Sequence, residues 1–362
     1  MNILAHFTRT FLGKIVLASL FFLSITASAN ALTLTPIRLE LQADPGQTLT
    51  EEVTLYNERP TTETFYISYA NFEAQGESGN PAFVEPKDGI GTWMQAAEKI
   101  VIAPKSSKTV PFTVSVPADA SAGGHFGAIF WGTTPQSSGA GQVSIGAKTG
   151  LLVLLSVSGP ISEKGGIVDF ATVGKKTFYT ALPVDFTYRF ENAGSDRIKP
   201  VGLVKIKNLL GFTAKEVPGN PADGNILPRS TRRFETAWVG KDIPNPAKTV
   251  EHSGFFNEAK YQWRNFAVGR YVAHLELAYG FQKETTSAKF SFWVLPWQLL
   301  LIILVIATLI FFLVRMSIRH YNKWVIERAE EMFEEMHAQK KRSIVHRVLR
   351  PVKKVVAKKE KK

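Results

Sequence analysis

One glycine-rich stretch of the chain, Ser121 to Gly132, has residue types that could do chemistry. Its sequence, SAGGHFGAIFWG, places paired glycines and His125 directly before an apolar run that ends in Phe130 and Trp131. A histidine acts as a base or nucleophile activator only where it has a partner to activate and a group that orients its ring. The neighbouring sequence supplies no such partners, so a structural role is favoured over a base or ligand role.

The glycines of this stretch predict a strand that fits tightly into a sheet. Glycine inside a strand marks a bulge or a close approach of another backbone. The run from Ala128 to Trp131 is apolar enough for a central strand. We therefore expect Gly123, Gly124 and Gly127 to be structural strand glycines.

Motifs of catalysis and metal binding are missing from the sequence. Before residue 290, the only histidines besides His125 and the signal-region His6 are His252 and His274, and none has H-x-x-x-H or H-x-H spacing. The chain has no cysteine, G-x-S-x-G, H-E-x-x-H, EF-hand loop or P-loop. The sequence predicts no enzyme, no catalytic residue, no cofactor and no metal site. An envelope enzyme whose acids meet only on folding is the less favoured alternative.

The first residues of the chain, 1–31, predict a cleaved signal peptide. Arg9 and Lys14 are followed by a short apolar core, and Ala29 and Ala31 fit small-x-small cleavage sites. The core is shorter than the roughly 20 residues that span a bilayer, which disfavours an uncleaved anchor.

Residues 293–315 predict a transmembrane helix. The sequence carries no charge from Phe290 to Val314, and hydrocarbon requires every backbone polar group to be paired within the segment. Tryptophans favour the headgroup layer, and a cluster of bases marks the cytoplasmic side. The expected membrane-interface anchors are Trp293, Trp297, Arg315 and Arg319. We expect a single-pass protein of the cell membrane, with an extracytoplasmic N-terminal ectodomain and a cytoplasmic C-terminus.

Most of the positive charge of the chain, which is +12 in all, lies in the tail. From residue 315 onward there are 15 Lys and Arg against 6 Asp and Glu, whereas residues 32–314 hold 26 against 25. A basic tail beside a membrane is attracted to anionic lipid. Residues 316–362 therefore predict a basic cytoplasmic tail that contacts lipid and not nucleic acid, with a helix over 316–341 and a break at Pro351.

Between the signal and the membrane segment, the pattern is that of β-strands. Apolar residues alternate with polar ones in many short runs separated by turn residues, and no stretch shows sustained helical periodicity. Two such runs are Val110–Val116 and Val184–Phe190. In each, every second residue is apolar, so these residues share one face of the strand. The expected fold class is mainly β, with two tandem immunoglobulin-like β-sandwiches at 32–160 and 165–292. A single transmembrane helix and a helical basic tail follow.

A weak internal repeat supports the division into two sandwiches. A strand ending at Asn57 is followed by the turn Pro104-Lys-Ser-Ser107, and a strand ending at Asn192 is followed by Pro228-Arg-Ser-Thr231. Coincidence between two β segments is the alternative.

The first sandwich resembles a bacterial extracellular family. The matching segments are LTPIRLELQADPGQ, VTLYNERPTTETFYISYANFEAQGE, IVIAPKSSKTVPFTVSVP and AGGHFGAIFW. The family was once known as domain of unknown function 916 (DUF916) and is described as the peptidoglycan-binding domain of WxL-interacting proteins. The resemblance covers about 32–160 and extends to the layout of signal, immunoglobulin-like ectodomain, C-terminal helix and basic tail. It implies a cell-wall polymer or surface protein as partner.

We therefore expect a non-enzymatic cell-surface protein of the cell envelope, whose ectodomain acts by peptidoglycan binding or protein binding. A transmembrane sensor or scaffold that couples the ectodomain to a cytoplasmic partner is the alternative. Ligand-binding residues cannot be named from the sequence. Four tryptophans could stack on sugar rings if their side chains are exposed: Trp93, Trp131, Trp238 and Trp263. Of these, Trp131 is expected to be buried.

Overall fold

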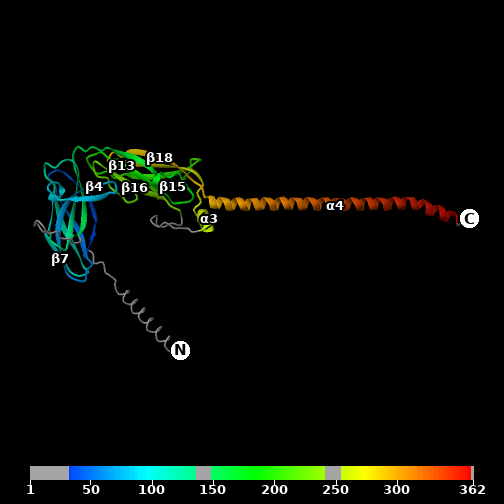
Figure 1. The fold of residues 1–362 in the computed structure, drawn as a ribbon, viewed down its shortest axis with the longest axis horizontal. Helices are drawn as coiled ribbons and strands as arrows, with labels where there is room; N and C mark the ends of the chain where they lie inside the picture. The colour runs from blue at the N-terminus through cyan, green and yellow to red at the C-terminus, as the bar shows by residue number, and fades with distance from the viewer. Residues whose placement is uncertain (1–31, 136–147, 241–253, 360–362) are drawn as a thin grey trace, which may run out of the picture. The chain divides into compact units, whose positions relative to one another are not determined.

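The computed structural model describes residues 32–135, 148–240 and 254–359 (Figure 1). The predicted signal peptide and its cleavage sites at Ala29 and Ala31 lie outside these residues. The chain forms two compact units. Unit 1 comprises Met1–Thr177, Asp185–Trp238 and Tyr271–Phe292, and unit 2 comprises Phe178–Val184, Val239–Arg270 and Trp293–Lys362.

The first sandwich is built from two sheets within unit 1. One sheet contains, in spatial order, β1 (Leu32–Thr35), β3 (Thr48–Asn57), β8 (Ser107–Ser115) and β6 (Met94–Ala96). The other contains β2 (Arg38–Ala43), β10 (Lys148–Val157), β9 (Gly123–Gly132), β4 (Glu63–Gln75) and β5 (Asn80–Val84), and β7 (Lys99–Ile102) also pairs with β4. The chain changes sheet between β1 and β2, and β2 then runs parallel to β10. The short helix α2 (Ile90–Trp93) precedes β6.

The core of this sandwich follows from the period-2 alternation. The predicted face of β8 is buried, with Val110, Phe112 and Val114 all no more than 3% exposed. Ile129 and Trp131 of β9 contribute to the same core from the other sheet, so each sheet covers the apolar face of the other.

The second sandwich repeats this plan. One sheet contains β11 (Gly165–Thr172), β13 (Val184–Asn192) and β16 (Ser230–Trp238). The other contains β12 (Phe178–Tyr179), β18 (Glu284–Val294), β17 (Gly269–Tyr279), β14 (Val201–Asn208) and β15 (Thr213–Pro218), and a short 3-10 helix, η1 (Val173–Lys175), lies between β11 and β12. The alternating residues of β13 are buried as predicted: Val184, Phe186, Tyr188 and Phe190. The expected fold class is therefore confirmed: two β-sandwiches followed by a long apolar helix.

The internal repeat has a structural counterpart in two buried asparagines. Asn57 ends β3 and Asn192 ends β13, and neither is exposed. The Nδ2 of Asn57 donates to the carbonyl oxygen of Ile102 at 3.1 Å, and the Nδ2 of Asn192 donates to that of Ile226 at 2.9 Å. Each asparagine thus ties the end of its strand to the segment that leads into the repeated turn.

The two turns of the repeat also share their conformation. The basic residue of each, Lys105 or Arg229, has a positive φ, at 50° and 56°. The next residue, Ser106 or Ser230, donates from Oγ to the carbonyl oxygen three positions earlier, at 2.7 Å in both turns. Such hydroxyl bonds are a standard way to satisfy a turn carbonyl.

Two helices of unit 2 differ from the sequence-based expectation. Helix α3 (Phe255–Arg264) lies in a region for which only strands were expected, because its 10 residues are too few for a sustained helical pattern. Helix α4 (Trp297–Lys359) starts after the predicted position 293, since Trp293 and Val294 still belong to β18 and pair with β12.

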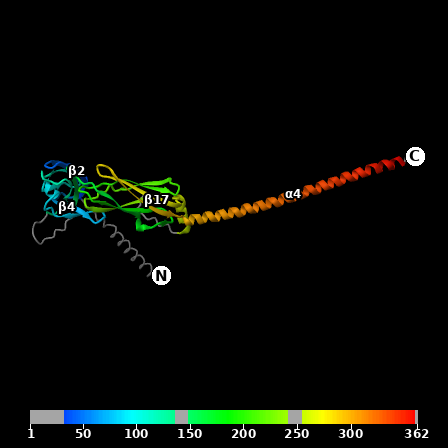
Figure 2. The ribbon, with the colours of Figure 1, turned by 90° about the horizontal axis from the view of Figure 1, so that it is seen from above.

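Helix α4 is a single unbroken helix, drawn from orange to red in Figure 1 and again in Figure 2. The helix over 316–341 is thus present. The predicted break at Pro351 is wrong, because the backbone stays helical through this residue to Lys359. A proline removes one helical hydrogen bond, and here that loss does not end the helix.

Candidate functional site

The glycine-rich stretch forms β9, in the middle of its sheet between β10 and β4. The Nε2 of His125 lies 2.8 Å from the carbonyl oxygen of Ser121, and its ring centroid lies 4.6 Å from that of Trp93. A carbonyl can only accept, so Nε2 carries the proton in this contact and cannot accept one from the Ser121 hydroxyl. This geometry gives His125 a packing and hydrogen-bonding role.

Three glycines of β9, Gly123, Gly124 and Gly127, each lie against a close neighbour. Gly123 has a φ of +113°, and a Cβ there would lie 2.4 Å from the carbonyl oxygen of Ser195. A Cβ at Gly124 would lie 2.8 Å from Oδ1 of Asp196, and one at Gly127 would lie 2.7 Å from Cγ2 of Ile90. Side-chain atoms do not approach so closely, so each site as it stands accommodates only hydrogen.

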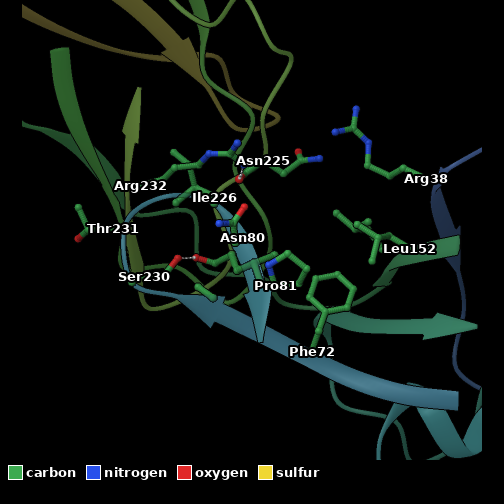
Figure 3. Close-up of a pocket in the computed structure, with 15 residues that line it drawn as sticks. Arg38, Phe72, Asn80, Pro81, Leu152, Asn225, Ile226, Ser230, Thr231 and Arg232 are labelled. Atoms are coloured by element: carbon green, nitrogen blue, oxygen red, sulfur yellow. Dashed lines mark hydrogen bonds between the residues drawn. The ribbon is translucent and has the colours of Figure 1, made fainter. Parts of the chain in front are cut away.

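A pocket in unit 1 collects polar and apolar side chains from both sandwiches (Figure 3). Its volume is about 160 Å³. The apolar wall includes Phe72, Pro81, Leu152, Leu154 and Ile226, and the polar wall includes Arg38, Asn80, Asn225, Ser230 and Arg232. A small concave site with an apolar wall and a few convergent polar groups is the usual form of a ligand site.

Most cations around this pocket already have acidic partners. Arg38 lies 3.2 Å from Glu40 and 3.1 Å from Asp223, measured from guanidinium nitrogen to carboxylate oxygen. Lys199 contacts the same two acids at 3.3 and 2.9 Å. The Lys199 ammonium is the main cause of the lowered pKa of the Asp223 carboxyl. These charges are therefore balanced within the protein.

Arg232 differs, because no carboxylate partners it among the residues that the structure describes. Its Nη1 donates to the backbone carbonyl of Asn225 at 2.7 Å, and its guanidinium lies 5.2 Å from the ring centre of Phe234. Its Nε is buried without a partner. Burial is the main cause that lowers the pKa of the Arg232 guanidinium, followed by repulsion from Arg38. A half-buried guanidinium without an acidic partner favours the binding of an anion.

Two glycines make room for the Arg232 guanidinium. A Cβ at Gly79 would lie 2.2 Å from the Cζ of Arg232, and a Cβ at Gly224 would lie 2.7 Å from it. Gly79 has a φ of +78°, which L side chains rarely adopt. The backbone therefore encloses the guanidinium from two segments far apart in the sequence.

Asn225 and Tyr188 carry unpaired polar atoms near the same guanidinium. Asn225 is 7% exposed, and its Nδ2 donates to Glu40 at 2.9 Å while its Oδ1 is buried without a partner. In Figure 3 its side chain lies beside Arg232, with Leu152 on a different wall. The Tyr188 hydroxyl is also buried and unpartnered, and burial raises its pKa. Buried polar groups without partners are uncommon.

The pocket can bind a small group that offers both an anion and a donor. The anion would meet the Arg232 guanidinium, and a neighbouring N–H or O–H would reach the buried Oδ1 of Asn225 after a shift of the pocket wall. Ser230 and Thr231 line the pocket, but none of its described lining residues is an Asp, Glu or His that could act as their base. Across the described ranges, no group of three His, Asp or Glu side chains is arranged to hold a metal ion.

The expected interface anchors lie on or beside α4. By its length and composition, α4 is the one described helix that can cross a membrane. Trp293 and Trp297 are 49% and 46% exposed, and Arg315 lies 18 residues after Trp297 on the same helix. At 1.5 Å per residue this spacing is roughly 27 Å, close to the thickness of a hydrocarbon core. The helix is consistent with a single-pass membrane anchor, and Arg319 follows one turn after Arg315.

The four tryptophans considered for sugar stacking are not equally available. Trp131 and Trp238 are buried in the two cores, at 1% and 6% exposure. Trp93 is partly buried against the first core, and its ring packs at a tilt against that of His125. Only Trp263, at 64% exposure, presents most of its ring.

The pocket is not predicted from the sequence. Arg38 and Arg232 both lie in segments that the repeat and the family resemblance drew attention to, but neither was singled out. In the sequence nothing distinguishes Arg232 from its neighbour Arg233, which lies 3.5 Å from Glu77 in the structure.

Comparison with known proteins gives distant structural similarity. No protein-family model matches the chain, and no curated protein matches it. The class 5 fimbriae chaperone CfaA is 14% identical with a TM-score of 0.35, over 72% of this chain and 99% of that one. The Escherichia coli chaperone DraB is 12% identical with a TM-score of 0.30, over 73% and 97%. A PapD-like domain of human CEP192 is 11% identical with a TM-score of 0.26, over 37% and 91%. The likeness is to PapD-like, immunoglobulin-like chaperone domains, and it concerns the fold alone.

Proposed function

We propose that this chain is a non-enzymatic, single-pass surface protein that binds an acidic group of a cell-wall polymer or of a wall-associated protein. The observation that carries the proposal is Arg232, a half-buried cation with no carboxylate partner in the described part of the chain. It lies in a pocket that also has an apolar wall and an unpaired acceptor on Asn225. Peptides and acidic sugars carry carboxylates beside N–H or O–H groups, which is the combination that this pocket fits.

The layout of the chain supports the location of this activity. A helix able to cross a membrane follows the two sandwiches, and Arg315 and Arg319 lie at the end of its apolar part. By the positive-inside rule we assign these bases to the cytoplasm and the sandwiches to the extracytoplasmic side. The resemblance of residues 32–160 to the DUF916 family of peptidoglycan-binding domains favours a wall component as the ligand.

The near-neutral charge of the sandwiches agrees with binding through one local contact. A half-buried ion pair is screened by salt much less than exposed charges are. Binding through Arg232 should therefore persist at ionic strengths that abolish general electrostatic attraction. No catalytic step is proposed, because the pocket pairs no nucleophile with a base.

The proposal is tested by comparing two neighbouring arginines of β16. Full-length protein in lipid nanodiscs is incubated with purified wall material and sedimented. We expect Arg232→Met to reduce the retained fraction and Arg233→Met to leave it unchanged, since Arg233 is 56% exposed and faces Glu77 at 3.5 Å. Equal retention of the wild type and Arg232→Met would refute the pocket as the binding site.

A sensor is the second candidate, favoured by the continuity of α4. The helix runs unbroken from Trp297 to Lys359, so a rotation or shift at one end can reach the other. This function requires a defined cytoplasmic partner. The tail is cross-linked in membranes with and without wall material. A sensor predicts that wall material changes the cross-linked product, whereas a simple anchor predicts no change.

A further inference from the structure

Helix α3 is fixed beside the first turn of α4 by contacts within unit 2. The Nε2 of Gln262 donates to Oε1 of Gln298 at 2.5 Å, and the backbone N–H of Leu299 donates to Oε1 of Gln262 at 3.0 Å. The rings of Phe255 and Trp297 meet at 5.8 Å between centroids. Gln262 is 1% exposed, so these bonds are shielded from water. If the first turn of α4 enters a membrane, α3 therefore lies close to the surface of that membrane.

The outward face of α3 carries large aromatic rings. Phe256 and Trp263 are 77% and 64% exposed, and seven residues, or about two helical turns, separate them. Lys260 lies between them on the same face by helical spacing, and Arg264 lies next to it. Phe266, just after the helix, is 56% exposed. Contiguous exposed aromatics on a protein surface mark an interaction site.

The composition of this face fits a lipid surface better than water or a protein core. Aromatic rings partition into the headgroup layer, and Lys and Arg extend their charges to lipid phosphates while their stems lie along apolar surface. Trp293 and Trp297, the exposed rings at the start of the membrane segment, belong to the same unit. Whatever contacts the exposed face of α3 must therefore lie beside the first turn of α4.

We propose that α3 is an interfacial helix that lies in the headgroup region of the membrane crossed by α4, with Phe256, Trp263 and Phe266 inserted and Lys260 and Arg264 at lipid phosphates. The proposal rests on the membrane anchoring proposed above. It adds a second attachment to the membrane, on the side of the sandwiches, and holds the exit of α4 at a fixed depth. A second copy of the chain or a protein partner on this face is an alternative occupant that the test separates.

Depth can be measured directly because the chain has no cysteine. Single substitutions Phe256→Cys, Trp263→Cys, Leu304→Cys and Ser107→Cys are labelled with an environment-sensitive fluorophore. Each full-length variant is reconstituted in phosphatidylcholine vesicles with a minority of phosphatidylglycerol. Nitroxide lipids labelled at a shallow or a deep position then report contact with the headgroup or acyl region. Thermal unfolding confirms that each variant is folded.

The expected pattern differs for each position. Labels at 256 and 263 should emit at shorter wavelength than the label at 107 and be quenched more strongly by the shallow nitroxide than by the deep one. The label at 304, in the apolar part of α4, should be quenched by the deep nitroxide. Emission and quenching at 256 and 263 equal to those at 107 would overturn the interfacial helix, while quenching at 304 would leave the membrane anchor intact.

Two further outcomes are separated by the same data. Blue-shifted emission at 256 and 263 without quenching by either lipid would mean that protein covers the face, and would overturn the lipid assignment. Loss of quenching at 304 would overturn the anchor itself, and with it the premise of the inference.

Discussion

Glu77 and Arg189, which are 112 residues apart, form a two-pronged ion pair inside unit 1. The Nε of Arg189 lies 3.0 Å from each carboxylate oxygen of Glu77, and its Nη2 also contacts Oε1. Glu77 lies in the turn between β4 and β5, and its backbone carbonyl accepts from the N–H of Arg233 at 2.7 Å. A turn of the first sandwich is thereby held on β13 and β16 of the second.

This ion pair makes a pH-dependent contribution to stability. The hydrogen bond from Arg189 is the main cause that lowers the pKa of the Glu77 carboxyl below its ordinary value of 4.5. Because the folded-state pKa is depressed, the contribution is present above pH 4.5 and is lost as the pH falls through the folded-state value. The unfolding temperature of the wild type should fall in this acidic range, and Glu77→Gln should remove part of that dependence.

The control for this prediction is an acid whose carboxyl does not join the two sandwiches. Glu276 also has a lowered pKa, caused mainly by a hydrogen bond from Lys205, but both residues lie in the second sandwich. By the same linkage, Glu276→Gln should also remove part of the acid dependence of the unfolding temperature, but only Glu77→Gln should change the pH at which the contact between the two sandwiches is lost. An identical pH profile for Glu77→Gln and the wild type would contradict the role assigned to the pair.

Substitution of the β9 glycines should destabilise the first sandwich. At Gly127 a side chain would meet Ile90 and Met94, both buried, and at Gly124 it would meet Phe126 and Asp196. Overpacking of this kind costs about 1–3 kcal/mol. Denaturant unfolding of Gly124→Val and Gly127→Val measures the change, and a wild-type free energy of unfolding in both would show that β9 tolerates the added atoms.

His125→Ala should cost about 1 kcal/mol or less, because it removes one ring contact and one hydrogen bond at a partly exposed site. Wall binding should be unchanged, since His125 does not line the pocket of Figure 3. A His125→Ala protein that folds but loses wall binding would show that this histidine takes part in binding.

Small carboxylates should stabilise the protein through Arg232. A ligand that binds only the folded state adds a stabilisation that grows as RT ln(1 + [L]/Kd). Acetate added at constant ionic strength should raise the unfolding temperature of the wild type more than that of Arg232→Met. Without acetate, Arg232→Met should unfold at the wild-type temperature or above it, because it removes a half-buried charge that has no acidic partner among the described residues. An equal acetate effect on both proteins would contradict anion binding at Arg232.

The sequence predicted those features that depend on local pattern. The buried faces of β8 and β13 follow from alternation, and the repeat around Asn57 and Asn192 was visible because each asparagine ends a strand before a similar turn. Helix α3 was missed because 10 residues give too few periods to separate it from strand. The unpartnered state of Arg232 could not be predicted, since it depends on which acids tertiary structure gives to Arg38, Arg189 and Arg233.

The orientation of the chain is predicted from the bases after the apolar segment. External protease added to intact cells should remove epitopes before Phe290 and spare a tag placed after Lys362. Permeabilised cells, in which both ends are accessible, give the control. Loss of the C-terminal tag alone in intact cells would contradict the orientation.

The most direct test of the proposed function is retention on isolated wall across a salt series. Full-length protein in nanodiscs is sedimented with purified wall and, in parallel, with membranes stripped of wall. Specific wall recognition predicts retention on wall only, and this retention should persist well above physiological ionic strength, where the Debye length falls below about 8 Å. Retention that disappears at moderate salt, or that is equal on the two materials, would contradict the account.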